Sequence, residues 1–321
     1  MQSFSIAIFR FYFNPLEEIR LPPYKGSAFR GGFGSVFKRV VCVNKEEDCK
    51  DCLLKFKCVY SYVFETPIDD RVEFKTTHMP HPYVIEPPLE NRTRYLPGDL
   101  FSVNLILVGK AIDYLPYFIF VMEMLGKNGI GKGRGRFLIE RAENLSHPFD
   151  TEGKVIFDAK TKRLLCDMDR ITFTCNKGEE ENNICRSLSL HFLTPTRITF
   201  RNRLTTPSDF NFPVFTRNLL RRINLLSHHC DTRLQIDYKN LLIQAESVQT
   251  NENRLYWYDW ERYSARQDTR MKLGGFKGKV TFYGPISPFL SLIKIGEYVH
   301  VGNDTSFGLG RYVIDKIVEK T

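Results

Sequence analysis

The sequence has no apolar run long enough to cross a membrane. Its most apolar stretch, residues 100–125, is interrupted by Lys110, Asp113 and Glu123, whereas a membrane helix needs about 18 uninterrupted apolar residues. The first residues alternate apolar and polar positions and include Arg10, so they lack the basic segment and apolar core of an export signal. We therefore expect a soluble protein of the cytoplasm with no membrane partner.

The sequence also lacks the common nucleotide-binding motifs. Its glycine-rich segments contain no Walker lysine, and their spacing differs from the dinucleotide-binding fingerprint because the glycines precede a strand rather than a helix. No nucleotide cofactor is therefore expected. Histidine is scarce, with seven residues in the chain and none before His78. The beginning of the chain can thus offer no imidazole for acid–base chemistry.

Basic residues outnumber acidic ones only locally. The net charge is +9, from 46 Lys and Arg against 37 Asp and Glu. Three segments, 127–136, 194–224 and 262–279, together carry +14, which leaves the rest of the chain at −5. Concentrated positive charge in an otherwise acidic chain is typical of a site for a polyanion. Solvated basic surfaces are the alternative interpretation.

The length of 321 residues, with 42% apolar and 13% aromatic side chains, allows two domains with buried cores. Alternating apolar residues predict a strand over 3–13, and Phe29, Phe33 and Phe37 at helical spacing predict a helix over 26–41. A glycine-rich loop is the alternative for the first turns of this helix, because each glycine costs about 1 kcal/mol there. Further strands are expected at 83–86, 100–112 and 137–143, and a short helix at 117–125.

The second half repeats this order, and one stretch repeats the letters. Gly133-Arg-Gly-Arg-Phe-Leu-Ile-Glu-Arg-Ala142 matches Gly308-Leu-Gly-Arg-Tyr-Val-Ile-Asp-Lys-Ile317 at a spacing of 175 residues. Each copy follows a short apolar helix that begins at a proline. The order strand, helix, strand, strand, helix, strand predicts an α+β fold, two tandem ferredoxin-like (RRM-like) domains with antiparallel sheets.

The expected organisation has three parts. Residues 1–145 form an N-terminal ferredoxin-like domain with a cysteine-rich insertion at 42–58, and residues 187–321 form a C-terminal one. Residues 146–186 are expected to be a linker with an extra hairpin that includes 155–157 and 171–174.

The end of the chain is rich in glycine, as His300-Val-Gly-Asn-Asp-Thr-Ser-Phe-Gly-Leu-Gly-Arg-Tyr312. Glycine lets a backbone approach a phosphate closely, and the small polar side chains can bond phosphate or ribose oxygens. A simple turn between helix and strand is the alternative. The RNA-binding candidates here are Gly302, Asn303, Ser306, Gly308, Gly310 and Arg311.

This ending resembles the glycine-rich signature of the CRISPR-associated RAMP endoribonucleases that process precursor CRISPR RNA. Pro22-Pro-Tyr-Lys-Gly-Ser-Ala-Phe-Arg-Gly-Gly-Phe-Gly34 and Cys58-Val-Tyr-Ser-Tyr-Val-Phe-Glu-Thr-Pro67 resemble a cysteine-containing branch of that superfamily. The likeness spans both ends and most of the length. The glycine motif is shared with RAMP members that bind RNA without cutting it.

The resemblance implies a cut in a repeat RNA without a metal, in which a ribose 2′-OH attacks the adjacent phosphate and leaves a 2′,3′-cyclic phosphate and a 5′-OH. This chemistry needs a base, an acid and cations around the phosphorane. In the family these groups cluster near the first helix, often around a histidine, but Ser35 stands in that helix here. His81 is a second acid–base candidate, with a rigid loop residue between two prolines as the alternative. The other catalytic candidates are Tyr24, Lys25, Arg30, Lys38 and Arg39.

Basic residues of both halves are candidates for binding RNA. Arg217 and Arg221 share a helix face, and a basic hairpin with its tight turn at Gly274-Gly275 could enter a groove of an RNA stem. Trp257, Tyr258 and Trp260 could stack on bases or pack in the core. The basic set comprises Lys132, Arg134, Arg136, Arg201, Arg203, Arg217, Arg221, Arg266, Arg270 and Lys272.

Four cysteines, Cys42, Cys49, Cys52 and Cys58, lie within seventeen residues. In a reducing compartment such thiols are more often metal ligands or core thiols than disulfides, and four free thiols are the alternative to a metal site here. Four thiolates in a compact loop suit a structural zinc ion, and an iron–sulfur cluster with the same ligands is the alternative.

The sequence therefore predicts a CRISPR-associated endoribonuclease with repeat RNA as its partner, effector-complex subunits as further partners and no cofactor for catalysis. The alternative is a RAMP RNA-binding subunit that holds guide RNA in an effector complex and cuts weakly or not at all. A metal-dependent hydrolase built on the cysteine cluster is a third, distinct possibility.

Overall fold

The chain divides into two compact units in the computed structural model, which describes residues 3–45, 47–68, 76–165, 167–174, 184–230, 234, 236–264 and 269–320. The N-terminal unit comprises residues 5–172 together with 228–231. The C-terminal unit comprises residues 1–4, 173–227 and 232–321. The division falls near residue 172, so part of the segment expected as a linker belongs to the N-terminal unit.

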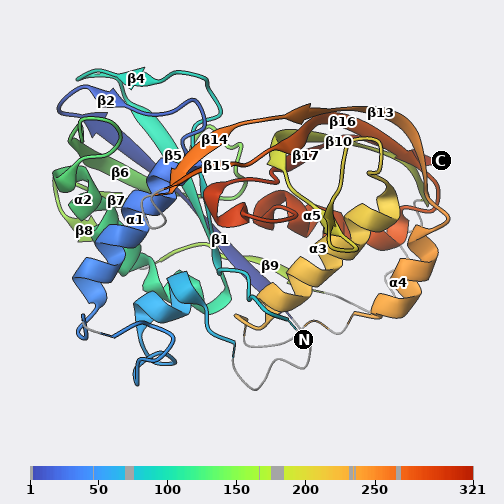
Figure 1. The fold of residues 1–321 in the computed structure, drawn as a ribbon, viewed down its shortest axis with the longest axis horizontal. Helices are drawn as coiled ribbons and strands as arrows, with labels where there is room; N and C mark the ends of the chain where they lie inside the picture. Colours follow the sequence, from blue (N-terminus) through green and yellow to red (C-terminus); the bar gives the residue numbers. More distant parts are fainter. Residues whose placement is uncertain are drawn as a thin grey trace. The chain divides into compact units, whose positions relative to one another are not determined.

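The N-terminal unit is built on an antiparallel sheet with the order β3-β5-β1-β6-β7-β8 (Figure 1). The order β1, α1, β3, β5, α2, β6 is the one predicted from the sequence, with the short strands β2 and β4 in addition. β1 lies between β5 and β6, as the ferredoxin-like pattern requires. The elements of this unit are β1 (Ser3–Pro15), β2 (Ile19–Arg20), α1 (Gly26–Val41), η1 (Ser61–Glu65), β3 (Tyr83–Glu86), β4 (Arg94–Tyr95), β5 (Phe101–Val108), η2 (Gly109–Tyr114), α2 (Leu115–Asn128), β6 (Phe137–Leu145), β7 (Lys154–Asp158) and β8 (Arg163–Leu164).

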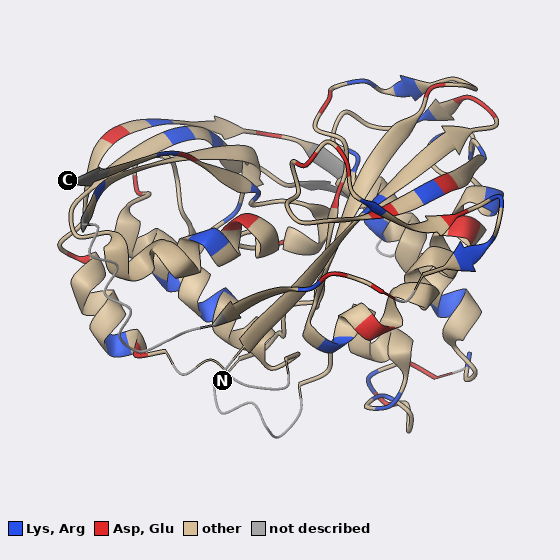
Figure 2. Ribbon diagram, turned by 180° about the vertical axis from the view of Figure 1, so that it is seen from behind, with Lys and Arg blue, Asp and Glu red and all other residues tan. Residues whose placement is uncertain are grey.

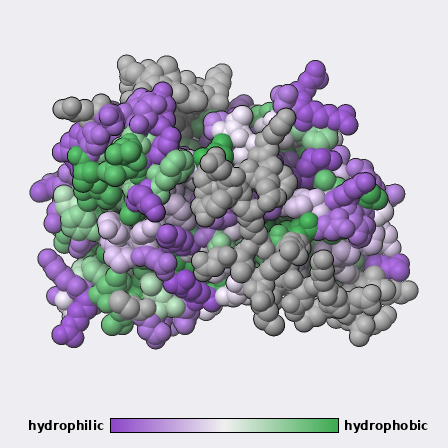
Figure 3. Space-filling view, turned by 90° about the horizontal axis from the view of Figure 1, so that it is seen from below, coloured by the Kyte–Doolittle hydropathy of each residue, from purple (hydrophilic) through white to green (hydrophobic). Residues whose placement is uncertain are grey.

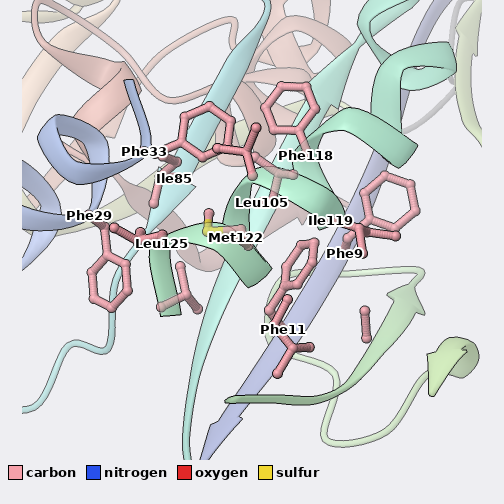
Figure 4. Close-up of a cluster of buried hydrophobic side chains, with 14 of the residues drawn as sticks. Phe9, Phe11, Phe29, Phe33, Ile85, Leu105, Phe118, Ile119, Met122 and Leu125 are labelled. Carbon is pink, nitrogen blue, oxygen red and sulfur yellow. The ribbon is translucent and has the colours of Figure 1, made fainter. Parts of the chain in front are cut away.

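Aromatic side chains fill the core between this sheet and its helices. Phe9 and Phe11 alternate along β1 and lie fully buried on one face, as the period of two requires. Figure 4 shows Phe33 of α1 beside Phe118 of α2, and their rings stack at 5.1 Å. Burial of each such ring contributes about 1.5–3 kcal/mol. The core therefore fixes α1 against α2 and the sheet.

Helix α1 runs unbroken from Gly26 to Val41, so the alternative of a glycine-rich loop is wrong. Packing leaves least room at Gly34, although a Cβ at Gly32 would also meet Leu125 at 2.9 Å. A Cβ at Gly34 would overlap the ring of Phe64, whereas a Cβ at Gly31 would meet nothing within 4 Å. Gly34 thus lets the Phe64 ring lie directly against the helix backbone.

The hairpin expected between the two domains exists, but its second strand was placed wrongly. β7 pairs with β8 and not with residues 171–174, which form a separate strand, β9 (Ile171–Thr174). β7 also pairs with β6, so the hairpin extends the sheet of the N-terminal unit. Because β7 and β8 belong to the sheet of the N-terminal unit, the boundary between the two units falls after them, near residue 172.

The C-terminal unit has a four-stranded antiparallel sheet with the order β13-β16-β10-β17, the same pattern as the first unit. Helices α3 and α5 lie side by side against it (Figure 1). Two tandem ferredoxin-like domains with antiparallel sheets are thereby confirmed. The elements are β10 (Ile184–Thr196), β11 (Thr199–Phe200), β12 (Arg203–Leu204), α3 (Phe212–Ser227), α4 (Tyr238–Ala245), β13 (Gln249–Tyr258), β14 (Glu261–Ser264), β15 (Thr269–Lys272), β16 (Gly275–Tyr283), η3 (Ser287–Phe289), α5 (Leu290–Val299), η4 (Thr305–Phe307) and β17 (Tyr312–Lys320).

Two features of this unit differ from the expectation. Helix α4 was not predicted, and the Gly274-Gly275 pair does not form the turn of the basic hairpin. The strands that pair in this hairpin, β14 and β15, both precede the two glycines in the chain. The glycines therefore lie at the junction of β15 and β16. Gly274 is required there because a Cβ would overlap Asp259 and the indole of Trp257.

Within the described part of the chain, no helix is long and apolar enough to span a bilayer. On the face drawn in Figure 3, green apolar patches are interrupted by purple hydrophilic residues. Several large apolar side chains of the cysteine-rich segment are exposed, among them Val43 and Leu53.

Two glycines of α1 provide a matched test of this packing. We expect Gly34→Ala to destabilise the protein by about 1–3 kcal/mol, because the new methyl group must displace a packed aromatic ring. Gly31→Ala should stabilise it by about 0.5–1 kcal/mol, since Gly31 faces open space within the same helix. Urea unfolding of both variants measures the difference, and equal effects would contradict the packing argument.

Candidate active site

Arg30 and His81, which the sequence offered as separate candidates, lie in contact. Arg30 projects from α1 and His81 from the segment that precedes β3. The Arg30 Nη2 atom lies 3.2 Å from His81 Nε2, although 51 residues separate the two. Both side chains are half-buried. A histidine therefore does reach the first helix, from a different part of the chain.

The hydrogen bonds of His81 define its tautomer. An arginine N–H can only donate, so Nε2 accepts the bond from Arg30 and the ring proton lies on Nδ1. Nδ1 then donates to Thr66 Oγ1 at 2.8 Å. A neutral imidazole with its Nε2 lone pair directed at a guanidinium is a base beside a cation. That pairing suits proton transfer next to a phosphate.

The aromatic ring of Phe64 packs against both Arg30 and His81. The Arg30 guanidinium carbon lies 4.1 Å from the centroid of its ring, within the range of a cation–π interaction. His81 stacks on the same ring with 6.1 Å between centroids, and on Tyr83 with 5.7 Å. The ring thus fixes the planes of both polar side chains.

The roles of Phe64 and Thr66 were missed in the sequence. Both lie in or beside η1, a π-helix that no periodicity indicates, and both belong to the Cys58–Pro67 motif that carried the family resemblance. The motif itself was therefore the available signal.

The side chain of Lys25 is buried, and its ammonium group is hydrogen-bonded to backbone carbonyls. Its Nζ donates to the carbonyls of Glu90 at 2.5 Å and Pro23 at 3.2 Å, and its side chain is fully shielded from solvent. Burial lowers the pKa of Lys25. The ammonium is engaged with backbone oxygens, so Lys25 ties the start of α1 to the segment around Glu90. A catalytic role for Lys25 stays a prediction.

The other three candidates lie on α1 or directly before it. Arg39 is exposed and falls nine residues after Arg30, on the opposite side of α1. Lys38 is half-buried and lies near enough to Cys49 to act on its pKa. Tyr24 is half-buried in the turn before α1.

The four clustered cysteines do not form a metal site in this arrangement. Burial raises the pKa of the Cys49 thiol, with further increases from Glu65, Cys42 and Cys58, while Lys38 opposes them. The Cys42 thiol donates to the Asn44 carbonyl at 2.9 Å. Among the described residues, no three His, Cys, Asp or Glu side chains are placed to hold an ion. The arrangement does not support the zinc predicted for Cys42, Cys49, Cys52 and Cys58.

The two glycine-rich loops, which are similar in sequence, differ in their exposure to solvent. In the N-terminal unit, Lys132 and Arg134 are exposed, and the loop is held by a hydrogen bond from Lys132 N to Arg20 O. Arg136 instead forms an ion pair with Glu17 at 2.6 Å. Blue and red segments likewise adjoin along β2 and β4 in Figure 2, where Glu18 pairs with arginines.

The loop at 300–311 in the C-terminal unit is mostly internal. The backbone N–H groups of Asn303, Gly308 and Gly310 donate to carbonyls within the unit. A Cβ at Gly302 or Gly310 would overlap neighbouring backbone, and both have positive φ. Asn303 is exposed, whereas the other candidates of the loop that follow it are buried: Ser306, Gly308, Gly310 and Arg311. Their contact with RNA stays a prediction.

The remaining basic candidates lie in the C-terminal unit. Arg201 and Arg217 both point at the ring of Phe200, with distances of 5.1 and 5.8 Å from guanidinium carbon to centroid. No ion pair joins either arginine to a described acidic residue. Arg203 and Arg221 are exposed. Arg270 and Lys272 lie on β15, and Arg266 falls outside the described residues.

The aromatic and histidine candidates divide between surface and interior. Trp257 is partly exposed, whereas Trp260 is buried. His229 lies in the turn that follows α3 and is buried. Its Nε2 lies 3.2 Å from the Pro80 carbonyl and its Nδ1 lies 3.1 Å from the Tyr62 hydroxyl.

Two family models match the chain. The model AF_1859_N, described as an N-terminal domain, matches residues 4–167, just over half of the chain. The model described as CRISPR-associated endoribonuclease Cas6 matches residues 190–312. An uncharacterized protein of Archaeoglobus fulgidus is 25% identical over 314 residues, which cover 95% of each chain.

Solved structures share the fold at low identity. A Cas6 product complex matches with a TM-score of 0.56 at 13% identity, over 96% of this chain and 99% of that chain. Thermus thermophilus Cas6 matches with a TM-score of 0.51 at 14% identity, over 97% and 98%. A partial Cas6-RT-Cas1–Cas2 complex matches with a TM-score of 0.57 at 14% identity, over 99% of this chain and 46% of that chain.

Proposed function

The chain belongs to the family of the AF_1859_N domain and to the CRISPR-associated RAMP proteins that process repeat RNA, and from this premise we propose that it cuts precursor CRISPR RNA without a metal. The proposed products are a 2′,3′-cyclic phosphate and a 5′-OH. The observation that carries the proposal is the contact between Arg30 and His81. It supplies a base and a cation within one hydrogen bond of each other.

The proposed reaction uses both groups at one phosphate. His81 Nε2 accepts the proton of the 2′-OH as the 2′ oxygen attacks phosphorus and the bond from phosphorus to the 5′ oxygen breaks. The departing 5′ oxygen, on the far side of phosphorus, takes its proton from water, and His81 returns the proton that it accepted to solvent. Arg30, which already faces Nε2, turns toward the phosphate and stabilises the negative charge that develops there. Thr66 and Phe64 keep the imidazole in place while the arginine moves.

Substitution of the pair tests these roles. We expect His81→Ala to slow single-turnover cleavage of labelled repeat RNA by about 10²–10⁴-fold, the usual contribution of a general base. Arg30→Ala should slow cleavage by a similar factor. Both should change RNA affinity far less than rate, because the roles concern the transition state.

Arg39→Ala is the matched control, since Arg39 carries the same charge on the opposite side of α1. It should leave the cleavage rate within about twofold. An equal loss for Arg39→Ala and Arg30→Ala would contradict the assignment. A loss of affinity that matches the loss of rate would move Arg30 into the RNA-binding surface.

Metal independence has its own test. Cleavage should persist in EDTA, because the proposed groups are side chains alone. A substrate with 2′-deoxyribose at the scissile position should remain intact, since the nucleophile is missing. Cleavage of the deoxy substrate would overturn the mechanism, and loss of activity in EDTA would support the metal-dependent alternative. No cleavage of either RNA would support a subunit that only binds guide RNA.

We further propose that the phosphate chain of the RNA is bound at exposed cations of each unit. The Arg201–Arg217 pair around Phe200 supports this, because two like charges that share one ring are relieved by an anion. Lys132 and Arg134 on the exposed glycine-rich loop are the corresponding cations of the N-terminal unit. Association with effector subunits and a cytoplasmic location stay predictions.

Salt dependence of binding tests the Arg201–Arg217 pair. The double substitution Arg201→Ala with Arg217→Ala should weaken repeat RNA binding and reduce the slope of log affinity against log salt by about 1.4, because single-stranded contacts contribute about 0.7 each. Arg254→Ala is the control, since Arg254 is ion-paired with Glu252 at 2.6 Å. Filter binding at several salt concentrations measures both, and an unchanged slope for the double variant would contradict the proposal.

A further inference from the structure

The π-helix η1 ends at a residue with an unusual backbone. Thr66 has φ 49° and ψ 64°, in the left-handed region, and its N–H donates to Ser61 O at 2.7 Å. Such a conformation is rare for a β-branched residue, and the following Pro67 favours extended backbone at position 66 as well. Neither local preference explains the geometry. The capping bond to Ser61 O and the contacts of the side chain hold it.

The Thr66 hydroxyl makes those contacts at His81. Its oxygen lies 2.8 Å from His81 Nδ1 and 3.4 Å from the Val63 carbonyl, and the residue is buried. The Thr66 hydroxyl donates its proton to the Val63 carbonyl. A lone pair of the hydroxyl oxygen can therefore accept the N–H of His81 Nδ1. This pattern agrees with the acceptance of the Arg30 N–H by Nε2 on the other side of the ring.

Two further side chains of η1 hold the surroundings of the same imidazole. Phe64 lies under the ring, at 6.1 Å between centroids. The Tyr62 hydroxyl lies 3.1 Å from His229 Nδ1, and His229 Nε2 lies 3.2 Å from the carbonyl of Pro80, the residue before His81. The π-helix therefore supports the ring face, one ring nitrogen and the preceding peptide.

We propose that Thr66 is a positioning residue that selects the Nδ1–H tautomer of His81 and holds its Nε2 toward Arg30. The inference rests on the proposed role of His81 in cleavage. The left-handed backbone at position 66 ends the π-helix and places the hydroxyl against Nδ1, and backbone strain of this kind clusters at functional sites. Without the hydroxyl, both tautomers and other ring orientations become accessible.

Three substitutions separate positioning from stability. Thr66→Ser keeps the hydroxyl and should retain the cleavage rate within about threefold of the native protein. Thr66→Val keeps the branched shape without the hydroxyl and should slow single-turnover cleavage by about tenfold or more, with RNA affinity nearly unchanged. Thr66→Gly relieves the left-handed backbone, so it should unfold at an unchanged or higher urea concentration and yet cleave as slowly as Thr66→Val.

A readout that does not depend on activity follows the ring itself. The ¹⁵N chemical shifts of His81 should show Nδ1–H in the native protein and in Thr66→Ser, but a mixture of tautomers in Thr66→Val and Thr66→Gly. In a His81→Ala background, Thr66→Val should cause no further loss of rate. The His81→Ala single variant also shows whether the proposed function holds.

The outcomes distinguish the two proposals. If His81→Ala cleaves at the native rate, the catalytic role of His81 fails, while the tautomer measurement still decides whether Thr66 positions the ring. An unchanged tautomer in Thr66→Val, or a further loss of rate in the His81→Ala background, would overturn the positioning role. A fast Thr66→Gly variant would overturn it as well.

Discussion

The guanidinium of Arg30 and the imidazole of His81 meet over the ring of Phe64, and this contact depends on how closely three separate segments approach one another. Helix α1 contributes the cation, the π-helix contributes the aromatic floor and the hydroxyl of Thr66, and the segment before β3 contributes the base. Neither polar group would keep its orientation in water. The aromatic core of the N-terminal unit holds the three segments in register, since Phe33, Phe118 and Tyr83 pack beneath them.

The approach of the π-helix to α1 requires a place without a side chain. Gly34 provides it, because the Phe64 ring occupies the volume that a Cβ would take. The ring then stacks with Tyr60, Tyr83 and His81 and lies under Arg30, with cation–π attraction worth about 0.5–2 kcal/mol in such partly desolvated sites. A helix that looked weakened by glycine is therefore the element to which the candidate site is attached.

Much of the fold could be predicted from periodicity, and the tandem ferredoxin-like order followed from a repeat of ten residues. The exact partner of β7 and the turn of the basic hairpin could not, because register depends on tertiary pairing. The π-helix was missed since its i to i+5 pattern has no signature in apolar spacing. Arg30 and His81 could each be named from their chemistry, but their contact spans 51 residues and only the folded chain brings it about.

The glycine-rich loops show why similar letters need not mean similar roles. At 300–311 the glycines let the chain pass close to neighbouring backbone, whereas at 129–136 the loop presents Lys132 and Arg134 to solvent. The most direct test of the central claim is a crystal structure of the protein with repeat RNA that carries 2′-deoxyribose at the scissile position. The account predicts the scissile phosphate within hydrogen-bond distance of Arg30 and the 2′ carbon of that ribose next to His81 Nε2. A scissile phosphate bound elsewhere, with the Arg30–His81 contact still closed, would contradict it.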